Sequence, residues 1–122
     1  MGDDAIGIIS TCWYSAQLDN PENKKFVEGM NRDYKVDPGF YAAATYTNGA
    51  VLEAALKKVD GKIEDKNALE AALRASDKIP TCRGPVSFDK YGNVVGNNYI
   101  RKVERKDGRL VNRVIKTYPN VS

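Results

Sequence analysis

The first patterned stretch of the chain runs from Ala5 to Ile9 and is a short apolar run rich in β-branched residues. Apolar side chains fall on both of its faces, which is typical of a strand covered on both sides within a parallel sheet. No later run has this character, and a parallel strand needs a parallel neighbour. We therefore expect its neighbours to come from outside these residues, and the chain to be one part of a larger α/β protein.

Three helices are predicted after this strand. Asn20 can cap the free backbone N–H groups of a first helix, and the proline after it suits the first helical position. The same signal at Asp37-Pro38 predicts a longer second helix, and Gly61 lies where that helix should end. Asp65 is the predicted cap of a third helix. The predicted apolar face of the first helix comprises Phe26, Val27, Met30 and Tyr34.

The last third of the sequence has the pattern of strands joined by tight turns. Residues 85–89 are predicted to form a strand, 89–93 a turn, and 98–105 a second strand with alternating side chains. Residues 106–109 contain an Asp-Gly pair, which favours a type I′ hairpin turn, and 110–116 form the return strand. The predicted order is one strand, three helices and three strands, which is an α/β fold.

The composition is that of an ordinary globular protein, since 42% of the 122 residues are hydrophobic and 29% are charged. The chain has no histidine, so the commonest general base and the commonest metal ligand are both missing. This weighs against hydrolytic triads and zinc enzymes, and we expect neither a metal nor a cofactor. The net charge of +3 is too small to indicate a nucleic-acid partner by itself.

Membrane and cysteine signals are weak. No apolar run approaches the roughly 18 residues that a membrane-spanning helix needs. The first residues lack the basic and apolar regions of a secretory signal. Cys12 and Cys82 permit one disulfide, and the alternative is two unpaired small apolar residues. Their spacing is too wide for a redox motif or a zinc knuckle.

The acidic residues that could act in catalysis or bind a metal, and the basic residues that could bind phosphate, are better explained by structural roles. Asp89 and Asp107 lie in predicted turns, and Glu64 with Asp65 lies at a helix start, where such residues bond to the backbone. Basic residues recur along the predicted hairpin, but Glu104 interrupts them and both strand faces share them. This favours a solvated hairpin over a phosphate-binding surface. The basic residues are Arg101, Lys102, Arg105, Lys106, Arg109, Arg113 and Lys116.

Four segments of the chain are informative as a set: Gly7–Thr11, Leu18–Val27, Phe40–Tyr46, and Arg83–Asp89 with Gly92. Each alone is a common pattern, whereas the ordered set spans almost the whole chain. Together they resemble type I periplasmic binding proteins of the leucine/isoleucine/valine-binding group. The resemblance implies a three-layer α/β/α fold with two lobes, joined by three crossing strands, and a small molecule in the cleft between the lobes.

The resemblance also implies that residues 1–122 are the C-terminal segment of such a protein, with most of the parallel sheet upstream. Residues 12–93 then resemble part of the N-terminal lobe, and residues 94–122 a hairpin that returns to the other lobe. The implied location is periplasmic or otherwise extracytoplasmic. The implied partners are a small-molecule ligand and, in the full-length protein, an ABC permease. Self-association of this segment is expected through its unpaired strand.

Four aromatic residues are candidates for contact with a ligand. Trp13 and Tyr14 follow the end of the first strand, and ligands of open α/β sheets gather beyond the carboxyl ends of strands. Tyr41 resembles a hydrophobic contact of leucine-type binders. Its neighbour Phe40 lies with it at a helix start, where free N–H groups suit a carboxylate. The alternatives are packing at the lobe junction for Trp13 and Tyr14 and a core position for Phe40 or Tyr41; of the last two, we expect Tyr41 to be the contact.

Three functions compete at this point. The first, which we expect, is the solute-binding component of an ABC importer for branched-chain or aromatic amino acids or related small carboxylates, without enzymatic activity. The second is a small α/β enzyme subunit without histidine-based catalysis, which would depend on cysteine, lysine, tyrosine or carboxylate groups. The third is a nucleic-acid binder that uses the basic hairpin, for which affinity would fall steeply with salt.

Overall fold

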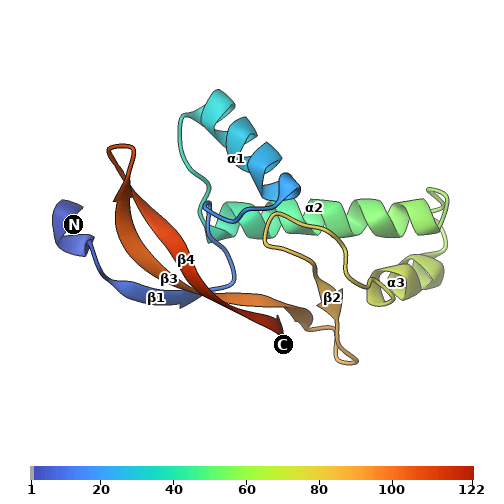
Figure 1. Cartoon of the computed structure of the whole chain (residues 1–122). Coiled ribbons are helices and arrows are strands. Elements are labelled where there is room, and N and C mark those ends of the chain that lie inside the picture. The colour runs from blue at the N-terminus through green and yellow to red at the C-terminus, as the bar shows by residue number, and fades with distance from the viewer. Residues whose placement is uncertain (1) are drawn as a thin grey trace.

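The computed structural model of the chain describes residues 2–122 and shows three helices beside a small antiparallel sheet (Figure 1). The predicted order of one strand, three helices and three strands is confirmed, with a short 3₁₀ turn before it. The elements are the turn Gly2–Ala5, β1 Ile9–Cys12, α1 Pro21–Tyr34, α2 Phe40–Lys58, α3 Lys66–Arg74, β2 Ser87–Phe88, β3 Val94–Lys106 and β4 Arg109–Val121.

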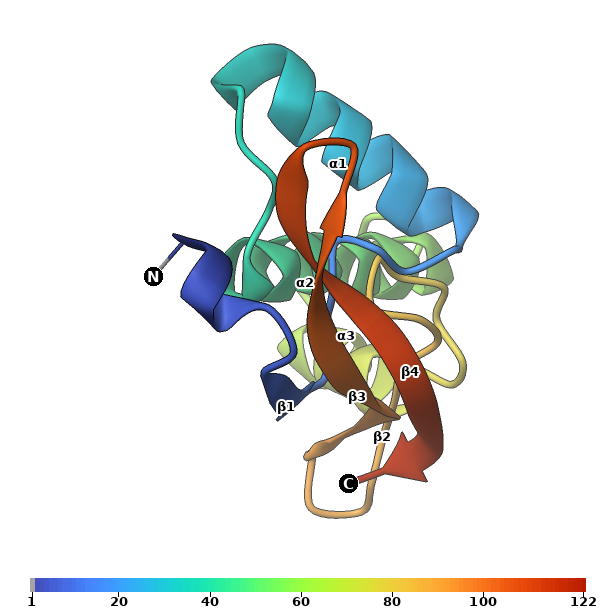
Figure 2. The same ribbon diagram turned by 60° about the vertical axis from the view of Figure 1, so that its left-hand side comes forward.

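Strand β3 is the centre of the sheet. Its residues Tyr99–Lys102 pair with β1 along one edge, from Cys12↔Tyr99 to Ile9↔Lys102, and with β4 along the other. The start of β3 pairs with the short strand β2. Every pairing is antiparallel. Figures 1 and 2 show the twisted β3–β4 ribbon beside the helices, with the C-terminus near β2 in both views.

The expectation for the first apolar run needs a correction. The run was expected to lie in a parallel sheet with all its neighbours outside the chain, but β1 pairs antiparallel with β3 of the same chain. The pairing extends to the preceding residues, because the Val103 N–H donates to Ile8 O at 2.9 Å. Ile6, Ile8 and Ile9 remain exposed. An apolar run indicates that something covers a strand, but it carries no information on the direction of its partner.

Local signals place the helix ends of α1 and α3 as predicted. The Asn20 side chain accepts the N–H of Asn23 at 2.8 Å, and Pro21 is the first residue of α1. Asp65 accepts the N–H of Ala68 at 3.0 Å and caps α3. Gly61 follows the end of α2 with a φ of +74°. One expectation for α1 is wrong: Tyr34 is exposed, because it lies at the last residue of the helix, where nothing packs over it.

The predicted start of α2 is also wrong. Gly39, rather than Asp37, is the N-cap, and no side chain caps the helix. The Asp37 carboxylate instead accepts a hydrogen bond from Asn31 Nδ2 at 2.8 Å and lies 3.6 Å from a guanidinium nitrogen of Arg109. These partners compete with the backbone for the carboxylate. The helix therefore starts two residues later than a local capping signal indicates.

The hydrophobic core lies where the loop after β1, α1, the first turns of α2 and the segment before β2 meet. Its buried members are Tyr14, Phe26, Ala43 and Cys82. Trp13 and Met30, both partly buried, pack against them. Burial of a large apolar side chain contributes about 1.5–3 kcal/mol. This core joins α1 and α2 to the end of β1 and so fixes the geometry of the residues that follow that strand.

Candidate ligand-binding site

Three of the four predicted contact residues come together where β1 ends and α2 begins. The Trp13 and Phe40 rings meet edge to face, with their centroids 5.9 Å apart. The Phe40 and Tyr41 rings lie 4.1 Å apart in a tilted arrangement. Trp13 is partly buried, whereas Phe40 and Tyr41 are exposed. We call these three residues the aromatic cluster.

Tyr14, the fourth predicted contact, is part of the core. Its ring packs against Phe26, with centroids 6.4 Å apart, and its hydroxyl donates to Asn23 Oδ1 at 2.9 Å. Burial raises the pKa of the Tyr14 phenol far above its ordinary value, so the group stays neutral. Tyr14 therefore packs in the core against α1.

Arg83 is a further residue of this region, and no local sequence signal marks it. Its Cζ lies 4.2 Å from the centroid of the Trp13 ring, within the range of a cation–π contact. Its Nε is buried and has no hydrogen-bond partner among residues 2–122. Burial lowers the pKa of the Arg83 guanidinium below its ordinary value. The contact joins residues far apart in the chain, so only the folded structure reveals it.

A hollow of about 340 Å³ adjoins Phe40. Its walls come from the loop after β1, the start of α2 and the β3–β4 hairpin, and include Ser15, Arg101 and Asn112. Ser15 Oγ donates to Asn112 O at 2.5 Å, and Arg101 Nη1 donates to Tyr14 O at 2.8 Å. These bonds tie the hairpin to the loop that carries Trp13. The hollow therefore combines an aromatic wall with fixed polar groups, as small-molecule sites do.

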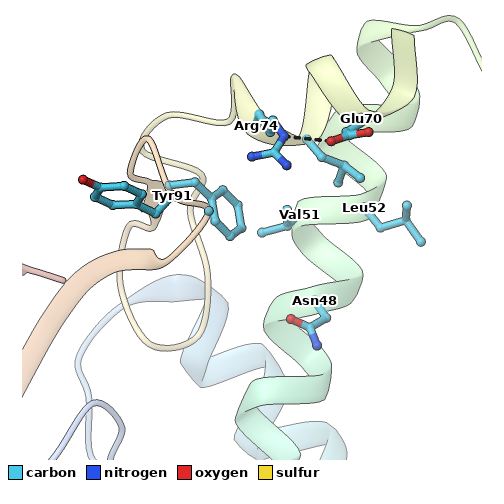
Figure 3. A pocket seen from close by; sticks show the side chains of 9 residues that line it. Asn48, Val51, Leu52, Glu70, Arg74 and Tyr91 are labelled. Atoms are coloured by element: carbon cyan, nitrogen blue, oxygen red, sulfur yellow. Dashed lines mark hydrogen bonds and ion pairs between the residues drawn. The ribbon is translucent and has the colours of Figure 1, made fainter. Parts of the chain in front are cut away.

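A second hollow, of about 590 Å³, lies between α2, α3 and the turn after β2 (Figure 3). Figure 3 shows Glu70 and Arg74 of α3 paired at its edge, with a distance of 2.9 Å between Arg74 Nε and Glu70 Oε1. Its other walls are mostly apolar and include Val51 and Phe88. None of the four predicted contact residues lines it. With few converging polar groups, it is the weaker candidate for a specific small molecule.

Both cysteines are free thiols in this structure, and the disulfide that their number permits is not formed. Cys82 is buried, and its Sγ lies 3.6 Å from Ala43 O and 3.7 Å from Thr47 Oγ1 of α2. Burial raises the pKa of the Cys82 thiol. Cys82 therefore acts as a small core residue. Within residues 2–122 no group of three or more cysteine, aspartate or glutamate side chains is arranged to hold a metal ion.

The structural interpretation is confirmed for Asp89, as it is for the cap Asp65. The Asp89 carboxylate accepts the N–H groups of Tyr91 and Asn93 at 2.8 and 2.9 Å, and hydrogen bonding from the Asn93 backbone holds the pKa of Asp89 below its usual value. On the hairpin, Arg113 binds Glu104 through two hydrogen bonds of 2.6 and 2.9 Å. The basic hairpin therefore carries its own counter-charge.

Residues 1–109 match the model of a known protein family, described as periplasmic binding protein. The chain belongs to the periplasmic binding protein family. The resemblance inferred from the four sequence segments is thereby confirmed. The family description names a binding protein, in agreement with the class of function that the sequence favoured.

Individual relatives of this periplasmic binding protein agree with the family match. The Leu/Ile/Val-binding protein homolog 6 of Brucella abortus (strain 2308) is 30% identical over 122 residues, which cover 97% of this chain and 31% of the relative. An ABC transporter substrate-binding protein from Sphaerobacter thermophilus superposes with a TM-score of 0.90 at 33% identity, covering 98% of this chain and 33% of the other.

A solute-binding protein from Rhodopseudomonas palustris BisB5, solved in complex with 3,4-dihydroxybenzoic acid, also superposes with a TM-score of 0.90. It is 37% identical and covers 100% of this chain, which spans 33% of that protein. The chain therefore spans about a third of the length of its relatives. Its mixed α/β architecture corresponds to one part of their fold. No helix within residues 2–122 combines the length and apolar character needed to cross a bilayer.

Proposed function

We propose that this chain is the C-terminal part of an extracytoplasmic receptor that binds a branched-chain or aromatic amino acid or a related small carboxylate for an ABC importer. The ligand contacts the aromatic cluster, and closure of two lobes encloses it. Residues 12–93 belong to one lobe, and residues 94–122 return to the other. The receptor binds its ligand without changing it and passes it to a membrane permease.

The observation that carries the proposal is the exposed part of the aromatic cluster. Tyr41 is 78% exposed, and Phe40 beside it is also exposed, although both rings are large and apolar. Exposed apolar side chains that adjoin one another mark binding surfaces more often than isolated ones do. The exposed area of these two rings is suited to contact with a flat or bulky apolar group.

The ligands bound to solved relatives support a small carboxylate as the ligand of this chain. Two solute-binding proteins from Rhodopseudomonas palustris, each 32% identical to this chain, were solved with benzoate and with 4-hydroxybenzoate. A third relative was solved with 3,4-dihydroxybenzoic acid. These ligands are flat aromatic acids. An aromatic cluster beside a polar hollow is complementary to such a shape.

The proposal is tested on the full-length receptor with matched tyrosine variants. A thermal-shift screen against benzoate, 4-hydroxybenzoate, leucine and phenylalanine identifies the ligand, and calorimetry measures its affinity. We expect Tyr41→Ala to weaken binding by about tenfold, equivalent to about 1.4 kcal/mol. Tyr91→Ala is the control, because Tyr91 is similarly exposed but lies beside the second hollow. The proposal fails if no acid or amino acid binds, or if the two variants weaken binding equally.

A further inference from the structure

The side chain of Arg83 makes no hydrogen bond or ion pair with any residue from 2 to 122, yet it is only partly exposed. A guanidinium group carries five N–H donors and is always charged. The other arginines of the chain differ from it, since each has a carboxylate or carbonyl partner. Arg101 donates to Tyr14 O, and ion pairs hold Arg32, Arg74, Arg105, Arg109 and Arg113.

The position of the guanidinium is fixed from two sides. The Trp13 ring lies below it, with 4.2 Å between Arg83 Cζ and the ring centroid. On another side, Gly96 of β3 leaves room for it, because a Cβ atom at that position would lie 3.4 Å from Nη2 and 3.7 Å from Cζ of Arg83. The guanidinium therefore packs closely against β3 at Gly96, where an added Cβ would be in van der Waals contact with it.

The backbone of Arg83 is equally well held. Its carbonyl accepts the hydroxyl of Tyr99 at 2.6 Å, and its N–H donates to Thr81 Oγ1 at 3.3 Å. Tyr99 and Thr81 are both buried. An arginine on a fixed backbone loses little conformational freedom when it binds an anion, which is the condition for efficient recognition.

The electrostatic surroundings leave the charge without compensation. Burial has the largest effect on the pKa of Arg83 and lowers it; the side chains that act on it in the opposite direction are Tyr99, Cys12 and Cys82, and none of them is a carboxylate. A partly buried cation without a counter-charge is costly, and a partner that brings a negative charge removes that cost. The free donors and the missing counter-charge both indicate an anion as the partner.

We propose that Arg83 binds the carboxylate group of the ligand, while the aromatic cluster contacts its apolar part. This inference rests on the proposed function and assigns the ligand class to organic acids that carry an apolar or aromatic body. The planar fork of a guanidinium matches the two oxygens of a carboxylate. Trp13 serves both halves of the site, since it contacts Arg83 with its face and Phe40 with an edge-to-face contact.

The test compares each acid with its amide in the full-length receptor. Calorimetry measures the affinities of 4-hydroxybenzoate and 4-hydroxybenzamide, and of leucine and leucinamide, for the wild type and for Arg83→Gln. We expect the variant to bind the acid at least about tenfold more weakly, the size of a lost charged hydrogen bond, and to bind the amide within about threefold of the wild type. Arg74→Gln is the control, because Arg74 pairs with Glu70 beside the second hollow and should leave both affinities unchanged.

A further variant keeps the test decisive if Arg83→Gln does not fold. Arg83→Lys retains the charge without the planar fork and should weaken binding of the acid selectively. An unchanged preference for the acid in these variants would overturn the inference. So would an equal loss for acid and amide, which would indicate that Arg83 pairs with an acidic side chain of the receptor itself. If the wild type binds none of these compounds, the proposed function fails first.

Discussion

Tyr14 and Tyr41 were both predicted as ligand contacts, but only Tyr41 is exposed to solvent. Tyr14 is 1% exposed, and its hydroxyl donates to Asn23 Oδ1. The amide nitrogen of Asn23 donates in turn to Ala16 O and Leu18 O at 3.1 and 2.9 Å. The buried amide is therefore fully paired, and it holds the loop after β1 against α1. Tyr41, which stays 78% exposed, is the tyrosine that we propose as the ligand contact.

At the residue scale we predict that Tyr14→Phe lowers the free energy of unfolding of the chain. The substitution keeps the ring but leaves Asn23 Oδ1 buried without a donor, which costs about 1–3 kcal/mol. Urea denaturation followed by circular dichroism measures the change. Tyr34→Phe is the control, because Tyr34 is exposed and its loss should stay within about 0.5 kcal/mol. Equal stability of the two variants would show that the buried hydrogen bond contributes nothing.

At the scale of single elements, the chain follows its local signals closely. Asn20 and Asp65 cap the helices that the sequence assigns to them. The turn between β3 and β4 has φ angles of +50° at Asp107 and +77° at Gly108, as a type I′ turn requires. α2 is the exception, because Asp37 is engaged by Asn31 and Arg109. A local signal therefore holds until a residue from another element competes for the same group.

Replacing glycine by alanine should change the stability of the chain in opposite directions at two positions. Gly108→Ala should destabilise the chain by roughly 1–2 kcal/mol, because alanine is strained at a positive φ. Gly29→Ala should stabilise it by about 0.5–1 kcal/mol, since Gly29 lies within α1 and an added Cβ meets no atom within 4 Å. Thermal unfolding of both variants measures the two changes. Shifts of the same sign would contradict the conformational explanation.

At the scale of the whole molecule, the apolar residues around β1 stand out. β1 pairs with β3 along one edge, and within residues 2–122 no strand pairs with its other edge. Ile9 is 63% exposed, and Ile6 and Ile8 before it are exposed as well. An exposed apolar edge is a surface on which another strand can pair. This chain spans about a third of its relatives' length. We expect residues of the kind found in the other two thirds to cover this edge.

We predict that the 122-residue chain self-associates through this edge and that Ile9→Lys suppresses it. A lysine on an edge strand opposes strand pairing because its charge would have to lose water. Sedimentation velocity over a range of concentrations measures the association. Leu52→Lys is the control, because Leu52 is an exposed apolar residue on α2, away from any strand edge. If both lysine variants dissociate the chain equally, general apolar contact and not the strand edge is responsible.

Part of the candidate site could be predicted from the sequence. The predictable residues lie next to the ends of elements, whereas the others are placed by contacts between distant parts of the chain. Trp13 and Tyr41 could be named because each adjoins an element end that the sequence marks, the end of a strand or the start of a helix. Tyr14 has the same sequence context as Trp13, and only its hydrogen bond to Asn23 shows that it faces the core. Arg83 could not be found, because its position depends on Trp13 and Gly96, which lie in other parts of the chain.

By itself, the sequence determined the order of the elements, the caps at Asn20 and Asp65, the hairpin turn at Asp107 and Gly108, and the family resemblance. These features depend on interactions within a few residues, so a local pattern is enough to encode them. Only the tertiary structure decided that β1 pairs antiparallel with β3 and that Arg83 stacks on Trp13. Both contacts join distant parts of the chain, and their partners are selected by how the core packs, which no local pattern records.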